Sequence, residues 1–367
     1  MQGRPAGRLG RRRLLKSMPW LAPAVAVACG QGTGGPLAVP ELPTPTPPPT
    51  ATPLPPTPTP VPYSPLTGRQ VDDPATIRRR IVAVKIDNAP EARPQYGLGE
   101  AEVVYEQLAE GGLTRFLALY LQSDAERVGP VRSARLTDIY LGQEWEFLLA
   151  YAGAGRTTAR LLADSLIPLF KAPELGERLE GTAYWRDSRR PPPYNLFVRV
   201  GGIRQAALRE GGIAPEVEIH PFPFQEPPPE PGPLRAVNLP YIPAAAVTWR
   251  YDPEAQVWKR MMARAAHVDA TTGLQLQVEN VLIQYAQIYA AQHVEPDAAG
   301  APALDTVLRG ENKARLFHSG HMYEGTWWKE HDRAKTSYRQ ADGSPLPFRP
   351  GRVWIHIIPT DFQASWS

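Results

Sequence analysis

The sequence predicts an α+β fold, in which a mixed α/β domain is followed by a mainly β domain. In the first half of the body, apolar runs typical of buried strands alternate with stretches of helical spacing. In the second half, strand-like runs follow one another with turn signals between them. A proline-rich tract separates the two patterns. We therefore expect an α/β domain over residues 63–220, a linker over 221–234 and a mainly β domain over 235–367.

The first 28 residues have the composition of an export signal. They hold six basic residues and no acidic one, and the apolar run Met18–Ala28 follows the basic stretch. This run is too short to span a bilayer, which takes about 20 residues, so residues 1–28 are predicted to be a signal peptide. Gly10–Lys16 (GRRRLLK) resembles the twin-arginine signal, and a plain Sec signal stays open as the alternative.

The predicted signal ends in a sequence that resembles a lipobox. Small residues, Ala26-Val27-Ala28, precede Cys29, although Ala26 stands where Leu is usual. We expect Cys29 to be acylated and to anchor the protein on the outer face of the cytoplasmic membrane. Because Cys29 is the only cysteine of the chain, none is left in the body for a disulfide, a metal site or a nucleophile.

Residues 29–62 are predicted to be a spacer. Pro36–Pro62 holds 13 prolines in 27 residues, mostly in Thr-Pro repeats. Such a composition cannot bury a core and favours extended polyproline II conformation. The spacer would hold the folded body away from the membrane.

The body beyond the spacer carries almost no net charge. From Tyr63 onward the chain has 34 basic and 36 acidic residues, so the net charge of +3 comes from the signal. Binding to nucleic acid requires a basic surface that displaces counterions. We therefore expect no nucleic-acid partner for the exported body.

Individual elements follow from the same patterns. Strands are expected in the first half at Ile81–Asp87, Val103–Leu108, Arg115–Leu121 and Phe147–Ala152, and helices at Ala134–Glu146, Thr157–Leu166 and Arg199–Arg209. Pro221–Pro233 interrupts any regular element. In the second half, strands are expected at Val247–Tyr251 and Gln256–Met262, and Asp252–Ala255 between them is a hairpin signal. Further strands are expected at Val278–Tyr289, Ala314–His318, Met322–Trp328 and Arg352–Ile358.

Polar side chains of the first half gather where its strands end, which is where α/β proteins place their sites. Arg132 and Arg135 lie three residues apart at the expected start of a helix, where guanidinium groups and free backbone N–H groups can hold a carboxylate or phosphate. Arg115 opens the preceding strand and is expected to face the same pocket. The candidate ligand-binding residues are Asp87, Arg93, Glu106, Arg115, Arg132, Arg135, Arg186, Asp187 and Asn195. The alternative is that these arginines form internal salt bridges with Glu106, Glu110 or Asp187.

No motif in the sequence specifies a reaction. Gly-x-Ser-x-Gly and the Rossmann glycine spacing are absent, and His318 and His321 flank a probable turn rather than one helix face. We expect no metal and no cofactor, and the catalytic residues, if the protein is an enzyme, stay unknown.

Several segments together resemble the YerB-like lipoprotein family, whose domain has no known function. They are Ser64–Gly68, Val82–Asn88, Ala92–Gln95, Glu110–Phe116, Gly129–Arg135, Trp185–Asp187, Asn195-Leu196, Val268-Asp269, Gly325–Trp327 and Pro350-Gly351. Tyr194 departs from the family pattern, in which a His is expected before the Asn. The resemblance implies a two-domain lipoprotein and supplies no activity.

A looser similarity concerns the LytR-CpsA-Psr phosphotransferases, which attach glycopolymers to the cell wall and use arginines on a lipid pyrophosphate. It depends on the order of strand, polar turn and arginines in Arg115–Asp138, and on the glycines of Tyr151–Gly155 before a helix. Three hypotheses follow. They are a tethered protein that binds an anionic envelope ligand, an envelope phosphotransferase and a scaffold with structural arginines. The oligomeric state stays open.

Overall fold

A computed structural model describes residues 62–173, 179–297 and 300–367. The signal peptide, Cys29 and nearly all of the spacer lie outside these residues. The described residues all belong to one compact unit. Among the described residues, no helix is long and apolar enough to cross a membrane.

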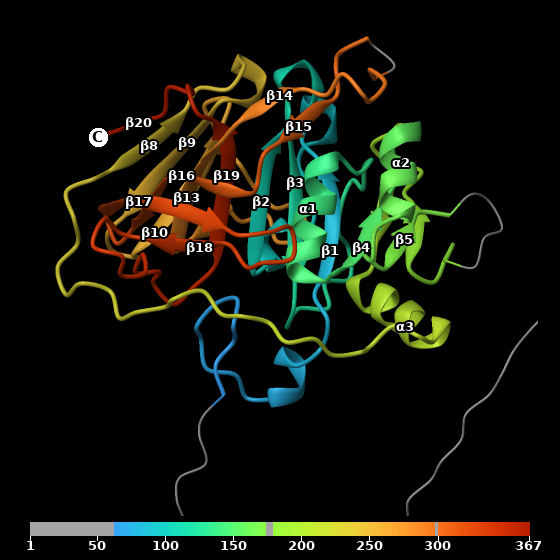
Figure 1. Cartoon of the computed structure of the whole chain (residues 1–367), viewed down its shortest axis with the longest axis horizontal. Coiled ribbons are helices and arrows are strands. Elements are labelled where there is room, and N and C mark those ends of the chain that lie inside the picture. Colours follow the sequence, from blue (N-terminus) through green and yellow to red (C-terminus); the bar gives the residue numbers. More distant parts are fainter. Residues whose placement is uncertain (1–61, 174–178, 298–299) are drawn as a thin grey trace, which may run out of the picture. The chain divides into compact units, whose positions relative to one another are not determined.

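The centre of the body is a ten-stranded mixed sheet (Figure 1). Its strands, in spatial order, are β18 (Ser337–Arg339), β17 (His321–Lys329), β16 (Gly310–His318), β13 (Asn280–Ala286), β19 (Val353–Pro359), β2 (Val103–Leu108), β3 (Thr114–Tyr120), β1 (Val82–Asp87), β4 (Leu148–Tyr151) and β5 (Leu169–Lys171). The pairings make β13, β19, β2, β1, β4 and β5 run in one direction, with β3 and β16 opposed to them.

A second, antiparallel sheet packs against this one. It contains β11 (Ala265–Ala266), β10 (Val257–Met262), β9 (Val247–Asp252), β8 (Ala236–Leu239) and β20 (Ser365–Trp366), with β12 (Gln277–Val278) paired to β10. Two small ribbons complete the strands, namely β6 (Tyr184–Arg186) with β7 (Leu196–Val198), and β14 (Ile288–Ala290) with β15 (Leu304–Thr306).

The α-helices cover opposite faces of the large sheet. The described residues hold three of them, α1 (Leu136–Trp145), α2 (Arg156–Ala163) and α3 (Val200–Glu210), besides short 3-10 turns at Pro74–Ile77, Pro90–Ala92, Leu98–Glu100, Glu110–Gly112 and Pro243–Ala245. α1 and α2 share a buried cluster with the odd-numbered side chains of β1, whereas α3 and the second sheet bury the even-numbered ones. Side chains alternate along a strand, so the residues of β1 to β3 divide between two separate interiors.

The predicted fold class is confirmed. The structure is mostly β, and all its described α-helices lie before residue 220. The expected strands and helices of the first half, and the expected Val247–Met262 hairpin, are present with end shifts of a few residues.

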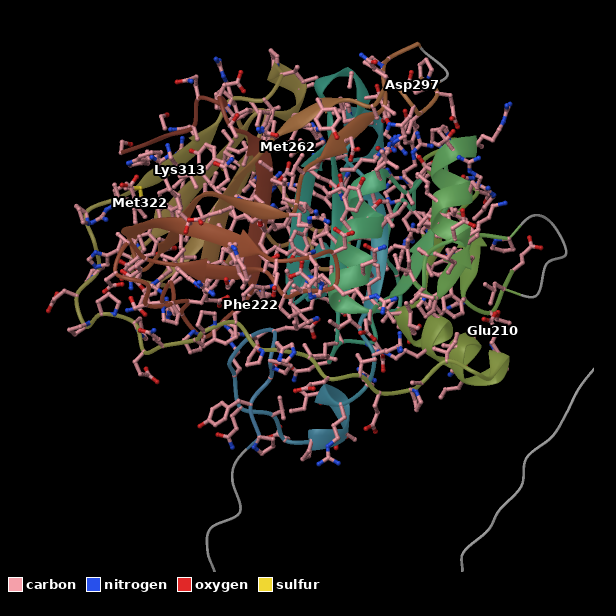
Figure 2. The ribbon with its side chains drawn as sticks, in the orientation of Figure 1. Glu210, Phe222, Met262, Asp297, Lys313 and Met322 are labelled. Atoms are coloured by element: carbon pink, nitrogen blue, oxygen red, sulfur yellow. The ribbon has the colours of Figure 1, made fainter. Side chains whose placement is uncertain are left out.

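The two predicted domains share one sheet. β19 lies between β13 of the second half and β2 of the first, and it pairs with both in parallel. A single sheet therefore crosses the predicted linker. Residues 221–234 do lack helices and strands, and they run past the sheet as an extended segment that carries Phe222 (Figures 1 and 2).

Candidate functional site

Three of the predicted arginines meet at one edge of the large sheet. Arg115 is the second residue of β3 and lies opposite Asp87, the last residue of β1, in the antiparallel register. Arg132 lies beside the end of β1, because its backbone N–H donates to the Lys85 carbonyl oxygen. Arg135 immediately precedes α1. The carboxyl ends of β1, β2 and β4 and the start of β3 thus share this edge.

Two carboxylates accompany these arginines. Arg132 Nε lies 2.7 Å from Asp87 Oδ2, and Arg115 Nε lies 3.9 Å from Asp87 Oδ1. Arg135 Nη2 donates to Glu110 Oε2 at 2.6 Å. We call these five residues, Asp87, Glu110, Arg115, Arg132 and Arg135, the arginine cluster. It brings together three guanidinium groups and two carboxylates.

The charges of the cluster are only partly compensated. Burial, and next the repulsion from Arg135, lower the pKa of Arg115 to about 10. The Asp87–Arg132 contact is close but lacks hydrogen-bond geometry, since Asp87 Oδ2 and Arg132 Nε both remain without a hydrogen bond. The side chain of Arg132 is 25% exposed, and among the described residues its two terminal nitrogens donate no hydrogen bond. An anion that approached from solvent would therefore meet unused donors.

A buried polar layer lies beneath the cluster. Lys85 Nζ and Gln107 Nε2 both donate to Asp138 Oδ1, at 2.8 and 2.6 Å. Burial lowers the pKa of Lys85 to about 8, although its ion pair with Asp138 acts in the opposite direction. Asp138 Oδ2 accepts from the backbone N–H of Arg135 at 2.7 Å. The carboxylate of Asp138 thus already occupies the N–H of Arg135, the residue before α1, so this N–H is not free for an anion.

Glu106 lies on the opposite face of the sheet, away from the cluster. It is fully buried, and Arg260 Nη2 approaches Glu106 Oε2 at 2.9 Å. Trp354 Nε1 also donates to this carboxylate. The expectation that Glu106 belongs to the arginine site is wrong, because Glu106 and Gln107 point to opposite faces and only Gln107 shares the face of Arg115.

Arg93 belongs to the network of Glu106. It donates to Asn88 through Nε and Nη2, Asn88 Nδ2 donates to Thr114 Oγ1, and Thr114 Oγ1 donates to Glu106. Burial, and next the charge of Arg260, lower the pKa of Arg93. Arg93, which follows the 3-10 turn Pro90–Ala92, thus links this turn to the interior and does not join the cluster.

The remaining predicted residues lie on the β6–β7 ribbon. Arg186 Nη1 donates to Asn195 Oδ1 at 3.0 Å. Asp187 accepts from Arg189 and from Arg127, and these hydrogen bonds, first that of Arg189, hold the pKa of Asp187 far below its usual value. The ribbon approaches the cluster through Tyr194, whose ring centre lies 5.7 Å from the Arg132 guanidinium carbon. Asp187 therefore forms salt bridges, but with Arg127 and Arg189 rather than with the arginines of the cluster.

Four polar residues in the cluster or beneath it are not among the predicted ligand-binding residues, namely Glu110 in the cluster and Lys85, Gln107 and Asp138 beneath it. Lys85 could have been recognised as the single charge in an otherwise apolar strand. The sequence suggests Glu110 only as an internal salt-bridge partner of the arginines, and Glu110 does pair with Arg135. In the described part of the chain, no group of three or more His, Cys, Asp or Glu side chains has the geometry to hold a metal ion.

Comparisons with known proteins place this architecture in a family. The model for the N-terminal domain described as "Protein of unknown function (DUF3048)" matches residues 66–213, and the model for its C-terminal domain matches residues 237–355. A relative in Bacillus subtilis (strain 168), named "Putative lipoprotein YerB", is 31% identical over an alignment of 315 residues, and the match covers 83% of this chain and 88% of the relative. The crystal structure of the YerB protein from Bacillus subtilis superposes with a TM-score of 0.71 at 30% identity, over 83% of this chain and 99% of that one. The resemblance seen in the sequence is thereby confirmed, and the chain belongs to the DUF3048 family of YerB-like proteins.

Proposed function

We propose that this protein is a membrane-tethered lipoprotein of the cell envelope that binds an anionic, phosphate- or carboxylate-bearing ligand at the arginine cluster. The tether would be acylated Cys29, on the outer face of the cytoplasmic membrane. The lipobox-like sequence before Cys29 supports this part, as does the name of the Bacillus subtilis relative, putative lipoprotein.

The observation that carries the ligand proposal is the excess of guanidinium groups over carboxylates in the cluster. Asp87 and Glu110 can neutralise two of the three arginines, and Arg115 keeps only long contacts, at 3.9 Å to Asp87 and 3.4 Å to the Ser133 carbonyl oxygen. Bringing three cations together costs free energy. A bound anion would offset that cost through charge-assisted hydrogen bonds.

The surroundings of Arg132 favour a ligand with a phosphate or carboxylate at its end. Its terminal nitrogens form a planar fork that suits two oxygens of one anion. The Tyr194 ring beside it provides an apolar wall for the atoms next to that anion. Phosphoryl transfer would require in addition a nucleophile and a base, and the geometry here supports binding alone.

Titration calorimetry with pyrophosphate tests the proposal on the soluble body, residues 63–367. Arg132→Gln should weaken binding by about 1.5–3 kcal/mol, the value of one charged hydrogen bond, and should leave the melting temperature nearly unchanged because Arg132 is partly exposed. Arg209→Gln is the matched control, since Arg209 is an exposed residue in the last turn of α3, on the other face of the sheet.

A second variant separates binding from folding. Arg132→Lys keeps a cation beside Asp87 but loses the planar fork, so it should weaken pyrophosphate binding without destabilising the fold. If the wild-type body does not bind pyrophosphate, or if Arg132→Gln and Arg209→Gln bind it equally well, the cluster is structural and the protein is better described as a scaffold.

A further inference from the structure

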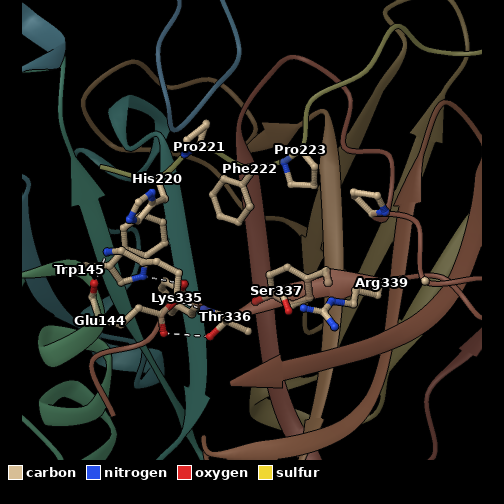
Figure 3. A pocket seen from close by; sticks show the side chains of 14 residues that line it. Glu144, Trp145, His220, Pro221, Phe222, Pro223, Lys335, Thr336, Ser337 and Arg339 are labelled. Atoms are coloured by element: carbon tan, nitrogen blue, oxygen red, sulfur yellow. Dashed lines mark hydrogen bonds between the residues drawn. The ribbon is translucent and has the colours of Figure 1, made fainter. Parts of the chain in front are cut away.

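A cavity of about 360 Å³ lies where the two halves of the sequence meet (Figure 3). The first half contributes Tyr105 of β2 and the end of α1, and the second half contributes β18 and its flanking turns. His220 and the first linker residues, 221–223, form the remaining wall. Ligand sites commonly form between such units, in clefts of this size with apolar walls and a few polar groups.

Aromatic side chains form the apolar part of this cavity. Tyr105, Trp145, Phe222 and Tyr338 line it, and the rings of Trp145 and Phe222 lie 5.9 Å apart. Their polar atoms are already engaged, because Trp145 Nε1 donates to Tyr105 Oη and Tyr338 Oη donates to Gln284 Oε1. The rings therefore offer a ligand their faces and edges rather than hydrogen bonds.

Two cations border the aromatic surface. Lys335 Nζ lies 4.9 Å from the centre of the Trp145 ring and donates one hydrogen bond, to the Glu144 carbonyl oxygen. Two of its three N–H donors thus remain available. Arg339 is exposed beside the cavity, and its guanidinium stacks over Trp328 at 5.2 Å. Figure 3 shows Lys335 and Arg339 on different sides of the space beneath Phe222.

The one carboxylate in the lining is already neutralised. Glu144 accepts from Lys329 Nζ at 2.9 Å and from both the backbone N–H and the hydroxyl of Thr336. Lys329 and Glu144 form a buried pair without net charge, and the described residues of the lining include no further carboxylate to neutralise Lys335 and Arg339. Burial lowers the pKa of Lys335, while the carboxylates of Glu144, Glu146 and Glu218 act in the opposite direction.

We infer that this cavity is a second binding site, separate from the arginine cluster, for a small aromatic anion that bears a phosphate or carboxylate. The ring of the ligand packs against Trp145 and Phe222, and its anionic group accepts hydrogen bonds from Lys335 and Arg339. The combination of aromatic rings and cations selects an aromatic anion. An aromatic surface alone would favour neutral rings, and the cations alone would favour inorganic anions.

Phenyl phosphate is the probe, and phenol is its neutral counterpart. Titration calorimetry on residues 63–367 should show saturable binding of phenyl phosphate and much weaker binding of phenol. Arg339→Gln, at an exposed residue, should weaken phenyl phosphate binding roughly tenfold or more, as expected for the loss of one charged hydrogen bond. Lys335→Gln should also weaken phenyl phosphate binding. If Lys335→Gln is unstable, Arg339→Gln alone still tests the inference, because Arg339 is exposed. Bound phenyl phosphate should also shift the indole N–H resonance of Trp145, which Trp145→Phe identifies.

Lys313→Gln is the matched control. Lys313 is an exposed lysine that also lies over an aromatic ring, 5.7 Å from the centre of Tyr285, and Figure 2 shows it well apart from Phe222. It should bind phenyl phosphate as the wild type does. Equal binding by Arg339→Gln, Lys335→Gln and Lys313→Gln would overturn the inference, as would the absence of binding to the wild type. Binding that is lost in Arg132→Gln but kept in Arg339→Gln would place phenyl phosphate at the arginine cluster. That result would overturn this inference and support the proposed function.

Discussion

Glu106 and Arg260 form an ion pair in which neither side chain is exposed, and the two residues lie 154 positions apart in the chain. Glu106 belongs to β2 of the large sheet and Arg260 to β10 of the second sheet. Arg260 Nε also donates to His267 Nδ1, and burial keeps the pKa of His267 well below its usual value. The pair therefore joins the two sheets at a point from which water is excluded.

Loss of one partner of this pair should strongly destabilise the fold. Arg260→Met leaves the Glu106 carboxylate buried without its cation, which typically costs about 3–5 kcal/mol of unfolding free energy. The neighbouring Lys259→Met is the control, because Lys259 pairs with Asp252 at a partly exposed position where such a pair contributes about 0.2–1 kcal/mol. Urea unfolding measures both. Equal losses in the two variants would contradict a special role for the buried pair.

The shared sheet predicts that the body unfolds in one step. Since β19 pairs with β2, a fragment that ends at residue 234 would expose the long inner edge of β2 and lose the second sheet from one face. We expect residues 63–234 alone to aggregate or to unfold without a cooperative transition, whereas co-expression with residues 235–367 should restore a folded complex. Calorimetry of the intact body checks the first point, and two resolved transitions would show that the halves are independent.

Local elements of this fold could be predicted from the sequence, because their signals are local. Val103–Leu108 is the strand that the apolar run indicates, and the predicted hairpin around residues 253–256 is present. The pairing of β19 with β2 could not be predicted, because no local pattern specifies which of two distant buried strands become neighbours. The proline-rich linker does mark a break between regular elements. It does not divide the large sheet, because β19 after it pairs with β2 before it.

The candidate site was predictable to the same extent. Arg115, Arg132 and Arg135 do meet, as expected from the strand–turn–helix order, and Asp87 lies among them. Glu106 was misplaced because a shift of one residue along a strand changes the face of the sheet. The partners that neutralise these charges, Glu110 above all, follow from tertiary geometry that spacing does not contain.

Replacement of Cys29 tests the membrane tether. Cys29→Ser removes the thiol that would carry the lipid, and the described residues offer no spanning helix in its place. We expect the variant to remain unprocessed or to appear in the soluble fraction, as judged by fractionation and by the mass of the N-terminal peptide. Cys29→Ser that is processed normally and stays in the membrane would refute anchoring at this residue.

The buried Lys85–Asp138 pair should give the protein an unusual dependence of stability on pH. The pKa of Lys85 falls from 10.5 to about 8 in the folded chain, mainly through burial. Between these values the unfolded chain still holds a proton that the folded chain has released, so raising the pH lowers the free energy of the folded state relative to the unfolded one. The contribution of Lys85 to stability should therefore increase from about pH 8 to pH 10.5 and stay constant below pH 8.

Lys85→Met removes the titrating group. The difference in unfolding free energy between wild type and Lys85→Met, measured by urea unfolding at several pH values, isolates the contribution of Lys85 from that of other groups. Lys313→Met, at an exposed lysine, should show no such trend relative to wild type. A difference between wild type and Lys85→Met that is flat across this window, or that changes in the opposite direction, would mean that Lys85 keeps an ordinary pKa in the folded protein.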